Sequence, residues 1–161
     1  MSKIDTLVVN FAAYEDATEF LGMTEATLPD VEYMSETLSG SGIAGEIDEI
    51  IAGYTSAMTT TLNFRTYTKS AVKLLEPRIH NIDLRVAQQQ TDSGTGDVGI
   101  VAVRHVLKVK PKKTAMGKLS AASEADVSGD YSTAYLATYI NNEKVTAVSY
   151  THLTLPTILL V

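Results

Sequence analysis

The stretch from Ala57 to Thr66 alternates apolar and polar side chains, and this pattern constrains the fold more than any other feature of the chain. The more apolar positions are Met58, Thr60, Leu62 and Phe64, and the polar positions are Thr59, Thr61, Asn63 and Arg65. A period of two places successive side chains on opposite faces of a strand. The stretch is therefore predicted to be a β-strand with one buried face and one polar face.

A second alternating stretch, His80–Gln90, is followed by a turn cluster and a further apolar stretch. Its two faces carry Ile82, Leu84, Val86 and Gln88 on one side and Asn81, Asp83, Arg85 and Gln89 on the other. Gly99–Lys110 returns as a strand, so residues 80–110 are predicted to form one long hairpin. Its tip carries Asp92 and Asp97, but the ligand spacing and the closing glutamate of a calcium loop are missing. A metal site is therefore not expected there.

Shorter segments extend the pattern on both sides of these strands. They are an N-terminal arm, Ile4–Leu21, the short strands Thr24–Leu28 and Glu32–Leu38, and a helix, Lys69–Glu76, ended by Pro77. Proline enters a turn but cannot donate a hydrogen bond within a central ladder, so the short strands are separated at Pro29. The helix spans two turns, and we expect Val72 and Leu75 to lie on its packed side.

The C-terminal part adds a loop and another strand. A loop over residues 117–129, rich in small side chains, precedes the expected strand Asp130–Ile140. The tyrosines at 131, 135 and 139 are spaced by four and are expected to share one face of that strand. Several two-faced strands with one helix predict a mainly antiparallel β-sandwich or half-open barrel.

Composition narrows the possible function. The 161 residues suit one domain, the absence of cysteine excludes disulfide and thiol chemistry, and three scattered histidines disfavour a structural zinc site. A net charge of −6 disfavours a surface evolved to grip nucleic acid. No apolar run approaches the roughly 18 residues of a membrane span, so we expect no membrane segment and synthesis in a cytoplasm.

Gly40 to Gly45 spells G-x-G-x-x-G, the pattern of a dinucleotide-binding turn. That turn must follow a buried strand, open a helix and be followed about 20 residues later by an acid that holds the ribose. Here the preceding segment is half polar, Gly53 interrupts the following one, and residues 63–65 contain no acid. We therefore expect a glycine-rich connection between two strands, and no cofactor.

Candidate catalytic residues are few. His80 and His105 lie on the apolar sides of their strands, which favours packed or interfacial roles over general base catalysis. Glu46, Asp48 and Glu49 have no recognisable partner nucleophile or acid, and a solvated face explains them. No catalytic, cofactor-binding or metal-binding residue is therefore predicted, and the chain is not expected to be an enzyme.

The chain has one basic run, Lys108-Val109-Lys110-Pro111-Lys112-Lys113. A solvated strand end is the simplest interpretation of such a run. A nucleic-acid patch and a docking surface are the functional alternatives, and the sequence leaves both open.

An ordered series of motifs runs along most of the chain. Its central members are Gly40, Gly42, Gly45, Glu46, Gly53, Met58, Phe64 and Arg65. Flanking members are Asn10-Phe11, Tyr14, Leu21-Gly22, Thr27 to Glu32, Val101 to Val106, Gly117-Lys118-Leu119 and Ala137-Thr138-Tyr139. The series covers about residues 8 to 146 and resembles the major tail tube proteins of contractile-tailed bacteriophages and of phage-tail-like bacteriocins. This resemblance rests on order along the chain and not on one motif.

This resemblance implies a structural subunit of the inner tube of a contractile tail. Subunits of such tubes form hexameric rings that stack, and their strands join between subunits into one barrel around a lumen. The expected partners are further copies, the tail sheath, the baseplate and the tape-measure protein, with DNA passing without specific binding. The expected location is the virion tail, assembled in the bacterial host cytoplasm.

Two alternatives to the phage tail tube remain. The first is the inner tube of a secretion or extracellular injection system, which carries effector proteins. The second is a monomeric β-domain that binds a small ligand in a pocket.

The polar strand faces are the candidates for the wall of the lumen. The alternation of the two clearest strands selects Thr59, Thr61, Asn63, Asp83 and Gln89. A polar face that would be a liability in a monomer becomes useful when it lines a channel.

We expect the tube domain to comprise residues 1–147, and residues 148–161 to be a non-native tail. Val148 to Thr157 resembles the translation of a transposon-end adapter used in sequencing libraries. Members of the resembled family continue at this point with a last strand and a closing helix. The authentic C-terminus is therefore expected to be replaced after Ala147, and a genuine divergent tail is the alternative.

Overall fold

The computed structural model describes residues 3–16, 19–42 and 44–149. Its elements are β1 (Lys3–Glu15), β2 (Glu19–Phe20), β3 (Met23–Thr27), β4 (Tyr33–Leu38), β5 (Ile47–Thr55), β6 (Met58–Phe64), α1 (Lys69–Lys73), β7 (His80–Asp92), β8 (Val98–Ala115), β9 (Val127–Ile140) and β10 (Glu143–Ser149). In this part of the chain no helix is long and apolar enough to cross a membrane.

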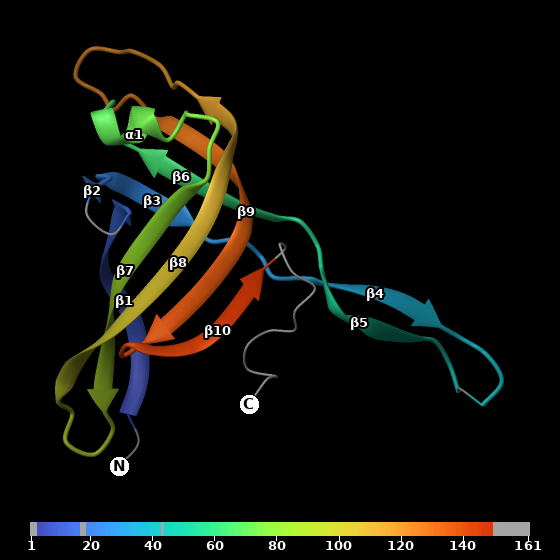
Figure 1. Ribbon diagram of the computed structural model, residues 1–161. Helices are drawn as coiled ribbons and strands as arrows, with labels where there is room; N and C mark the ends of the chain where they lie inside the picture. The colour runs from blue at the N-terminus through green and yellow to red at the C-terminus, as the bar shows by residue number, and fades with distance from the viewer. Residues whose placement is uncertain (1–2, 17–18, 43, 150–161) are drawn as a thin grey trace.

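The main sheet is antiparallel, has the order β2-β1-β7-β8-β9-β6-β3, and curls into a half-barrel (Figure 1). One side of β9 is shared, because residues 127–133 pair with β6 and residues 135–140 pair with β10. The long strands β7, β8 and β9 therefore belong to two regions. We call β1-β7-β8-β9-β10 the lower sheet and β7-β8-β9-β6-β3 the upper sheet.

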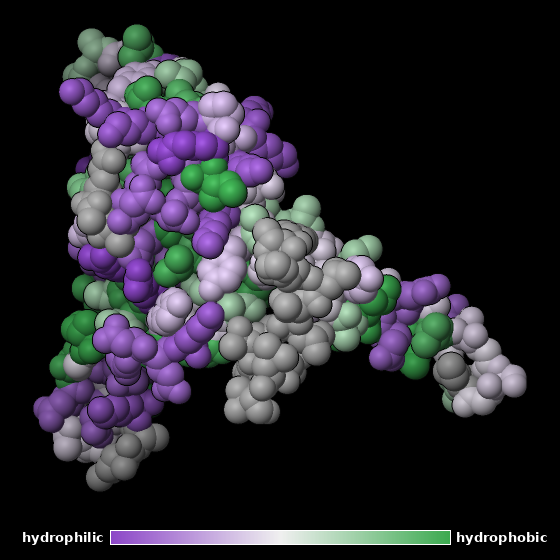
Figure 2. All heavy atoms as spheres, in the orientation of Figure 1, coloured by the Kyte–Doolittle hydropathy of each residue, from purple (hydrophilic) through white to green (hydrophobic). Residues whose placement is uncertain are grey.

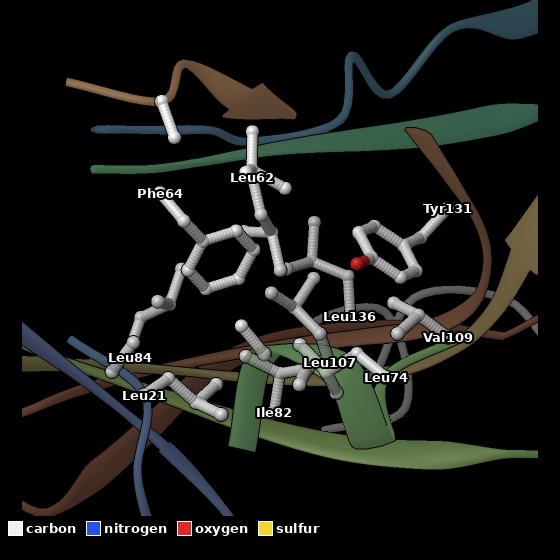
Figure 3. Close-up of a cluster of buried hydrophobic side chains, with 14 residues drawn as sticks. Leu21, Leu62, Phe64, Leu74, Ile82, Leu84, Leu107, Val109, Tyr131 and Leu136 are labelled. Atoms are coloured by element: carbon white, nitrogen blue, oxygen red, sulfur yellow. The ribbon is translucent and has the colours of Figure 1, made fainter. Parts of the chain in front are cut away.

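The core fills the concave side of the upper sheet. Figure 3 shows side chains from β6, β7, β8 and β9 pointing toward one another, with Leu74 approaching from the end of α1. Leu62, Leu74 and Leu107 are fully buried, and burying a side chain of this size contributes about 1.5–3 kcal/mol. Tyr131 lies in the same cluster, and burial raises the pKa of its hydroxyl to about 12.

The two alternating stretches behave as predicted. Along β6 the even positions are buried and the odd positions are partly exposed. β7 and β8 pair continuously from His80 opposite Val109 to Thr91 opposite Val98, which confirms the long hairpin. The second strand of that hairpin extends beyond the expected end, to Ala115.

The packed face of the helix differs from the prediction. Ala71 and Leu74 are buried, whereas Val72 and Leu75 are 46% and 36% exposed. The Thr68 hydroxyl accepts a hydrogen bond from the Ala71 N–H and caps the helix, which ends at Lys73 and so is shorter than the two turns expected. Positions 71 and 74, three residues apart, lie on one side and face the core.

The tyrosines of β9 do not share one face. Lys108 pairs with Tyr135 and Val109 pairs with Thr133, so Ala134 has no partner on β8 and forms a β-bulge. An extra residue reverses the alternation beyond it. Tyr131 therefore points into the core, and Tyr135 lies on the convex face.

Four strands were not recognised in the sequence. β1 and β2 lie within the expected arm, and β1 pairs with β7 over nearly its whole length. β5 replaces part of the expected glycine-rich connection and forms a separate hairpin with β4. β10 follows Asn141 and Asn142, which have positive φ and form the turn after β9.

The expected C-terminal boundary falls inside β10. Val148 is 9% exposed and pairs with Leu136, and Ser149 pairs with Tyr135. Residues 150–161 lie outside the described residues. The proposal that the native domain ends at residue 147 therefore stays a prediction.

Candidate assembly interface

The lower sheet exposes apolar side chains on both of its faces. On β1, the consecutive residues Leu7, Val8 and Val9 are each more than half exposed, and Leu7 and Val8, which pair with Gln89 and Gln88, lie on opposite faces. On β8, Val98 and Ile100 are 62% and 63% exposed and lie opposite the face that carries Val101 and Val103. A strand that is apolar on both faces is typical of a sheet covered on both sides. The isolated subunit leaves this surface open to water.

Two long strand edges are unpaired among the described residues. β1 forms one side of the lower sheet, and β2 covers only Tyr14 and Glu15 at its end. β10 forms the other side and pairs only with β9. Each edge presents backbone N–H and C=O groups that another strand can pair with.

The β4–β5 hairpin projects away from the half-barrel (Figure 1). It forms its own two-stranded sheet, and its large apolar side chains are exposed along both strands: Met34, Leu38, Ile47, Ile50, Ile51 and Tyr54. At its base the Ser56 N–H donates to the Glu32 carbonyl at 2.7 Å. An isolated two-stranded hairpin is marginal in water, and this hairpin has no packed core of its own among the described residues.

The central family motif is divided between this hairpin and the core. Gly40, Gly42 and Gly45 lie in the turn between β4 and β5, and Glu46 is exposed immediately before β5. Gly53 has φ +86° within β5, a conformation that a side chain disfavours. The remaining members lie at β6 and just after it, where Met58 and Phe64 are buried and Arg65 pairs with Glu124 at 3.4 Å.

The five candidates for the lumen wall lie on the convex face, away from the core. Thr59, Thr61 and Asn63 are partly exposed on β6, and Thr61 donates to Asp130 at 2.9 Å. Gln89 is half-buried on β7. The sequence therefore identified one continuous face, and whether that face lines a lumen stays a prediction.

Asp83 is buried beneath two arginines. Its carboxylate accepts from Arg104 at 2.8 Å and from Arg85 at 3.4 Å, and it is 3% exposed. Arg85 and Arg104 lie directly opposite each other on β7 and β8. Like charges in this position repel, so the carboxylate between them stabilises the sheet. The hydrogen bond to Asp83 raises the pKa of Arg104.

Cations lie over tyrosine rings along the same convex face. The Arg104 guanidinium is 5.8 Å from the centre of the Tyr139 ring, and the Lys108 ammonium is 5.4 Å from that of Tyr135. Figure 2 shows hydrophilic side chains gathered over β8 and β9 in this view. The convex face is therefore charged and aromatic as well as polar, which alternation alone did not indicate.

Both strand histidines are held by hydrogen bonds within the fold. His80 is fully buried, with Nδ1 2.7 Å from Glu15 and Nε2 2.9 Å from the Glu76 carbonyl. Arg78 donates to the same Glu15 carboxylate at 3.1 Å. His105 lies 3.0 Å from Thr138 on the neighbouring strand, and burial lowers the pKa of its imidazole. These contacts join strands and the turn before β7.

The acidic residues weighed as catalytic or metal-binding are exposed, except Asp92, which is half-buried. Asp48 accepts from Thr37 across the β4–β5 hairpin, and Glu49 lies beside it on β5. At the β7–β8 turn, Asp92 accepts from the backbone N–H groups of Gly94 and Thr95. Among the described residues, no group of three or more metal-ligating side chains comes together.

The concave side of the lower sheet contains an open hollow of about 330 Å³. Its lining is mainly apolar and comes from β1, β7 and β8 together with the segment around Leu28. This hollow is the feature that the ligand-binding alternative would require.

Solved structures with the same fold include components of an extracellular contractile injection system and of the anti-feeding prophage. The sheath/tube terminator of the PVC extracellular contractile injection system, in its extended state, has a TM-score of 0.62 at 10% identity, over 84% of this chain and 97% of that chain. The sheath–tube complex of the same system scores 0.51 at 9% identity, over 87% and 88%. The anti-feeding prophage tube-terminating cap scores 0.51 at 11%, over 86% and 87%.

This fold, with its free edges and projecting hairpin, defines a tube-type β-subunit. The chain belongs to the Phage tail tube protein FII family, which matches residues 5–153. No curated protein matches the sequence. The match confirms the resemblance seen in the ordered motifs.

Proposed function

We propose that this chain is the inner-tube subunit of a contractile tail, in which six copies form a ring and the rings stack into a conduit. The observation that carries the proposal is the pair of unpaired edges, β1 and β10, on opposite sides of one sheet. A subunit with a free edge on each side joins its neighbours edge to edge, and a ring closes the series. Family membership supports the same assignment.

Ring closure also accounts for the exposed apolar surface. Pairing β1 of one copy with β10 of the next places Leu7 and Val9 beside a neighbouring subunit, where burial is favourable. Stacked rings cover further surface through the hairpin. The joined sheets then enclose a lumen through which DNA passes.

The proposal extends to the partners of such a tube. The sheath surrounds it, and the baseplate and the tape-measure protein set its ends and length, with assembly in the host cytoplasm before the finished virion tail. The structural neighbours come from extracellular injection systems, so effector proteins in place of DNA are the second candidate cargo. No catalytic step is part of either candidate.

Proline substitution at the two edges tests the assembly. Val9 and Val145 each sit at a register shift where the neighbouring strand has no residue opposite them. Val9→Pro or Val145→Pro removes an N–H from an edge strand at a position without a direct partner, and we expect rings and tubes seen by electron microscopy to disappear while the circular dichroism of the subunit is retained. Val9→Thr and Val145→Thr keep the N–H and should assemble.

A purified chain that stays monomeric at high concentration, with or without sheath and baseplate proteins as nucleators, would contradict the proposal. A small ligand retained by the monomer in the concave hollow would then support the binding-domain alternative.

A further inference from the structure

The convex face of β8 carries a line of lysines that we call the lysine stripe: Lys108, Lys110 and Lys113. All three are exposed, and none forms an ion pair among the described residues. Their cross-strand neighbours are Asn81 and Tyr135 for Lys108, and Ser132 for Lys110. Asp130 lies opposite Lys113 but accepts a hydrogen bond from Thr61. The stripe is thus a concentrated positive surface on a chain of net charge −6.

The projecting hairpin has the opposite charge. Every charged residue from Tyr33 to Thr55 is acidic: Glu36, Glu46, Asp48 and Glu49. Glu36 lies directly opposite Glu49 in the β4–β5 register, and both are exposed. Like charges directly opposite each other destabilise a hairpin, and neither carboxylate has a cationic partner among the described residues. This face of the hairpin therefore lacks the cations that would stabilise it.

We propose that the acidic face of the β4–β5 hairpin of one copy docks on the lysine stripe of a neighbouring copy. The inference rests on the proposed tube and names the surfaces that hold its subunits together. Within one subunit the hairpin points away from the half-barrel (Figure 1), so it is presented to a neighbour.

The dimensions and side chains of the two surfaces match. Residues two apart on a strand are about 7 Å apart, and directly opposed residues about 5 Å, so two lysines reach two glutamates through their flexible stems. Leu38 and Ile47, the next opposed pair on the same face of the hairpin, are exposed beside the glutamates. Tyr135, under Lys108, offers an aromatic surface to such apolar side chains.

A nucleic-acid phosphate backbone is the competing occupant of the stripe. It would neutralise the lysines but leave the opposed pair Glu36 and Glu49 without a cation. The docked hairpin satisfies both surfaces at once. Because whole copies of charge −6 repel one another, a local attractive contact also sets the geometry in which they meet.

Isotope-mixed cross-linking tests the contact directly. Full-length chains with light and heavy nitrogen are mixed, assembled and treated with a zero-length carbodiimide, which joins carboxylates to amines in contact. We expect mixed-isotope peptides that link Glu36 or Glu49 to Lys108 or Lys110. Assembled material without such links overturns the inference and leaves the proposed tube intact, whereas a strictly monomeric chain overturns both.

Charge reversal provides the second measurement. Lys108→Glu/Lys110→Glu and Glu36→Lys/Glu49→Lys should each reduce the assembled fraction about tenfold at low salt, and combining all four changes should restore it. The matched control Lys69→Glu/Lys118→Glu alters two exposed lysines outside the stripe and should assemble normally. If both double variants are folded and the fourfold variant still does not assemble, the inference is overturned. Loss of DNA retention without loss of assembly in the lysine variant would assign the stripe to nucleic acid instead.

Discussion

At the scale of single residues, the hydroxyl groups of Thr60 and Thr133 meet inside the core, 2.6 Å apart and inaccessible to solvent. Thr60→Val leaves the Thr133 hydroxyl buried without this partner, which costs about 1–3 kcal/mol of unfolding free energy. We expect the double variant Thr60→Val/Thr133→Val to be more stable than the sum of the two single changes predicts, because both polar groups are then removed. Urea unfolding of the four proteins measures this coupling, and additive losses would contradict it.

A second residue-scale prediction concerns acid stability. Burial lowers the pKa of His105 from its ordinary value of 6.5, so the unfolded chain binds a proton more readily than the folded one. The contribution of His105 to stability is present above pH 6.5 and is lost as the pH falls through the lowered pKa.

The matched variant is His105→Gln, which does not titrate and keeps a polar group near Thr138. Urea unfolding at several pH values between about 7.5 and 5 should show a smaller acid loss in the variant than in the parent chain. His80 is present in both proteins, so the difference between them reports His105. If the free energy of unfolding depends on pH equally in the variant and the parent chain, the folded and unfolded states bind protons equally at His105, which would contradict the prediction.

At the scale of elements, we expect the β4–β5 hairpin to be separable from the rest of the subunit, because it forms a sheet of its own. The hydrogen bond from Ser56 N–H to the Glu32 carbonyl holds the two ends of the excised segment close together. Replacing residues 33–55 by Asn-Gly should therefore change the unfolding free energy of the half-barrel by less than about 1 kcal/mol while preventing tube formation. Calorimetry and electron microscopy test the two parts, and a subunit that no longer folds would show that the hairpin belongs to the core.

Strands were predictable where one face is buried and the other polar. β6, β7 and β8 have this asymmetry in the region of the upper core, so period two revealed them. β5 is exposed over nearly all of its length. Because neither of its faces is buried within the subunit, its sequence has no alternation of apolar and polar residues that would reveal a strand. β10 is interrupted by the register shift at Val145, which breaks its pattern.

The candidate interface could be predicted only in part. Met58 and Phe64 were identified because core positions are apolar, and the glycines because a turn needs them. Which strands form the edges of the sheet depends on how the strands pair with one another across the fold, as β1 pairs with β7 and β9 with β10. No local pattern encodes that pairing, so the two free edges became visible only in the fold.

At the scale of the whole molecule, thiol labelling of assembled tubes decides which surface faces the lumen. The chain has no cysteine, so a single cysteine introduced at Thr61 or at Gln89 is the only thiol that can react with the label. We expect Gln89→Cys in tubes to react with a small maleimide but not with a polymer-coupled one, as a lumen position should. Thr61→Cys lies near the lysine stripe and should be protected from both reagents by the docked hairpin.

Leu62→Cys is the buried control, because Leu62 is inaccessible in the subunit itself. Labelling of Thr61→Cys by the small reagent alone would support the wider lumen wall inferred from alternation and would contradict hairpin docking. Labelling of both test positions by the large reagent would place the convex face on the outside of the tube.

The strands shared by the two sheets also have a mechanical consequence. β8 runs for 18 residues and β9 for 14, each crossing from the lower to the upper sheet without a loop. At about 3.3 Å per residue, the longer strand measures about 60 Å along its curved path. In the proposed tube, tension applied where neighbouring subunits pair with β1 and β10 would pass along the covalent backbone and its cross-strand hydrogen bonds into the upper core. The two sheets would then deform together under load, and a column of such subunits would resist bending when a surrounding sheath drives it forward.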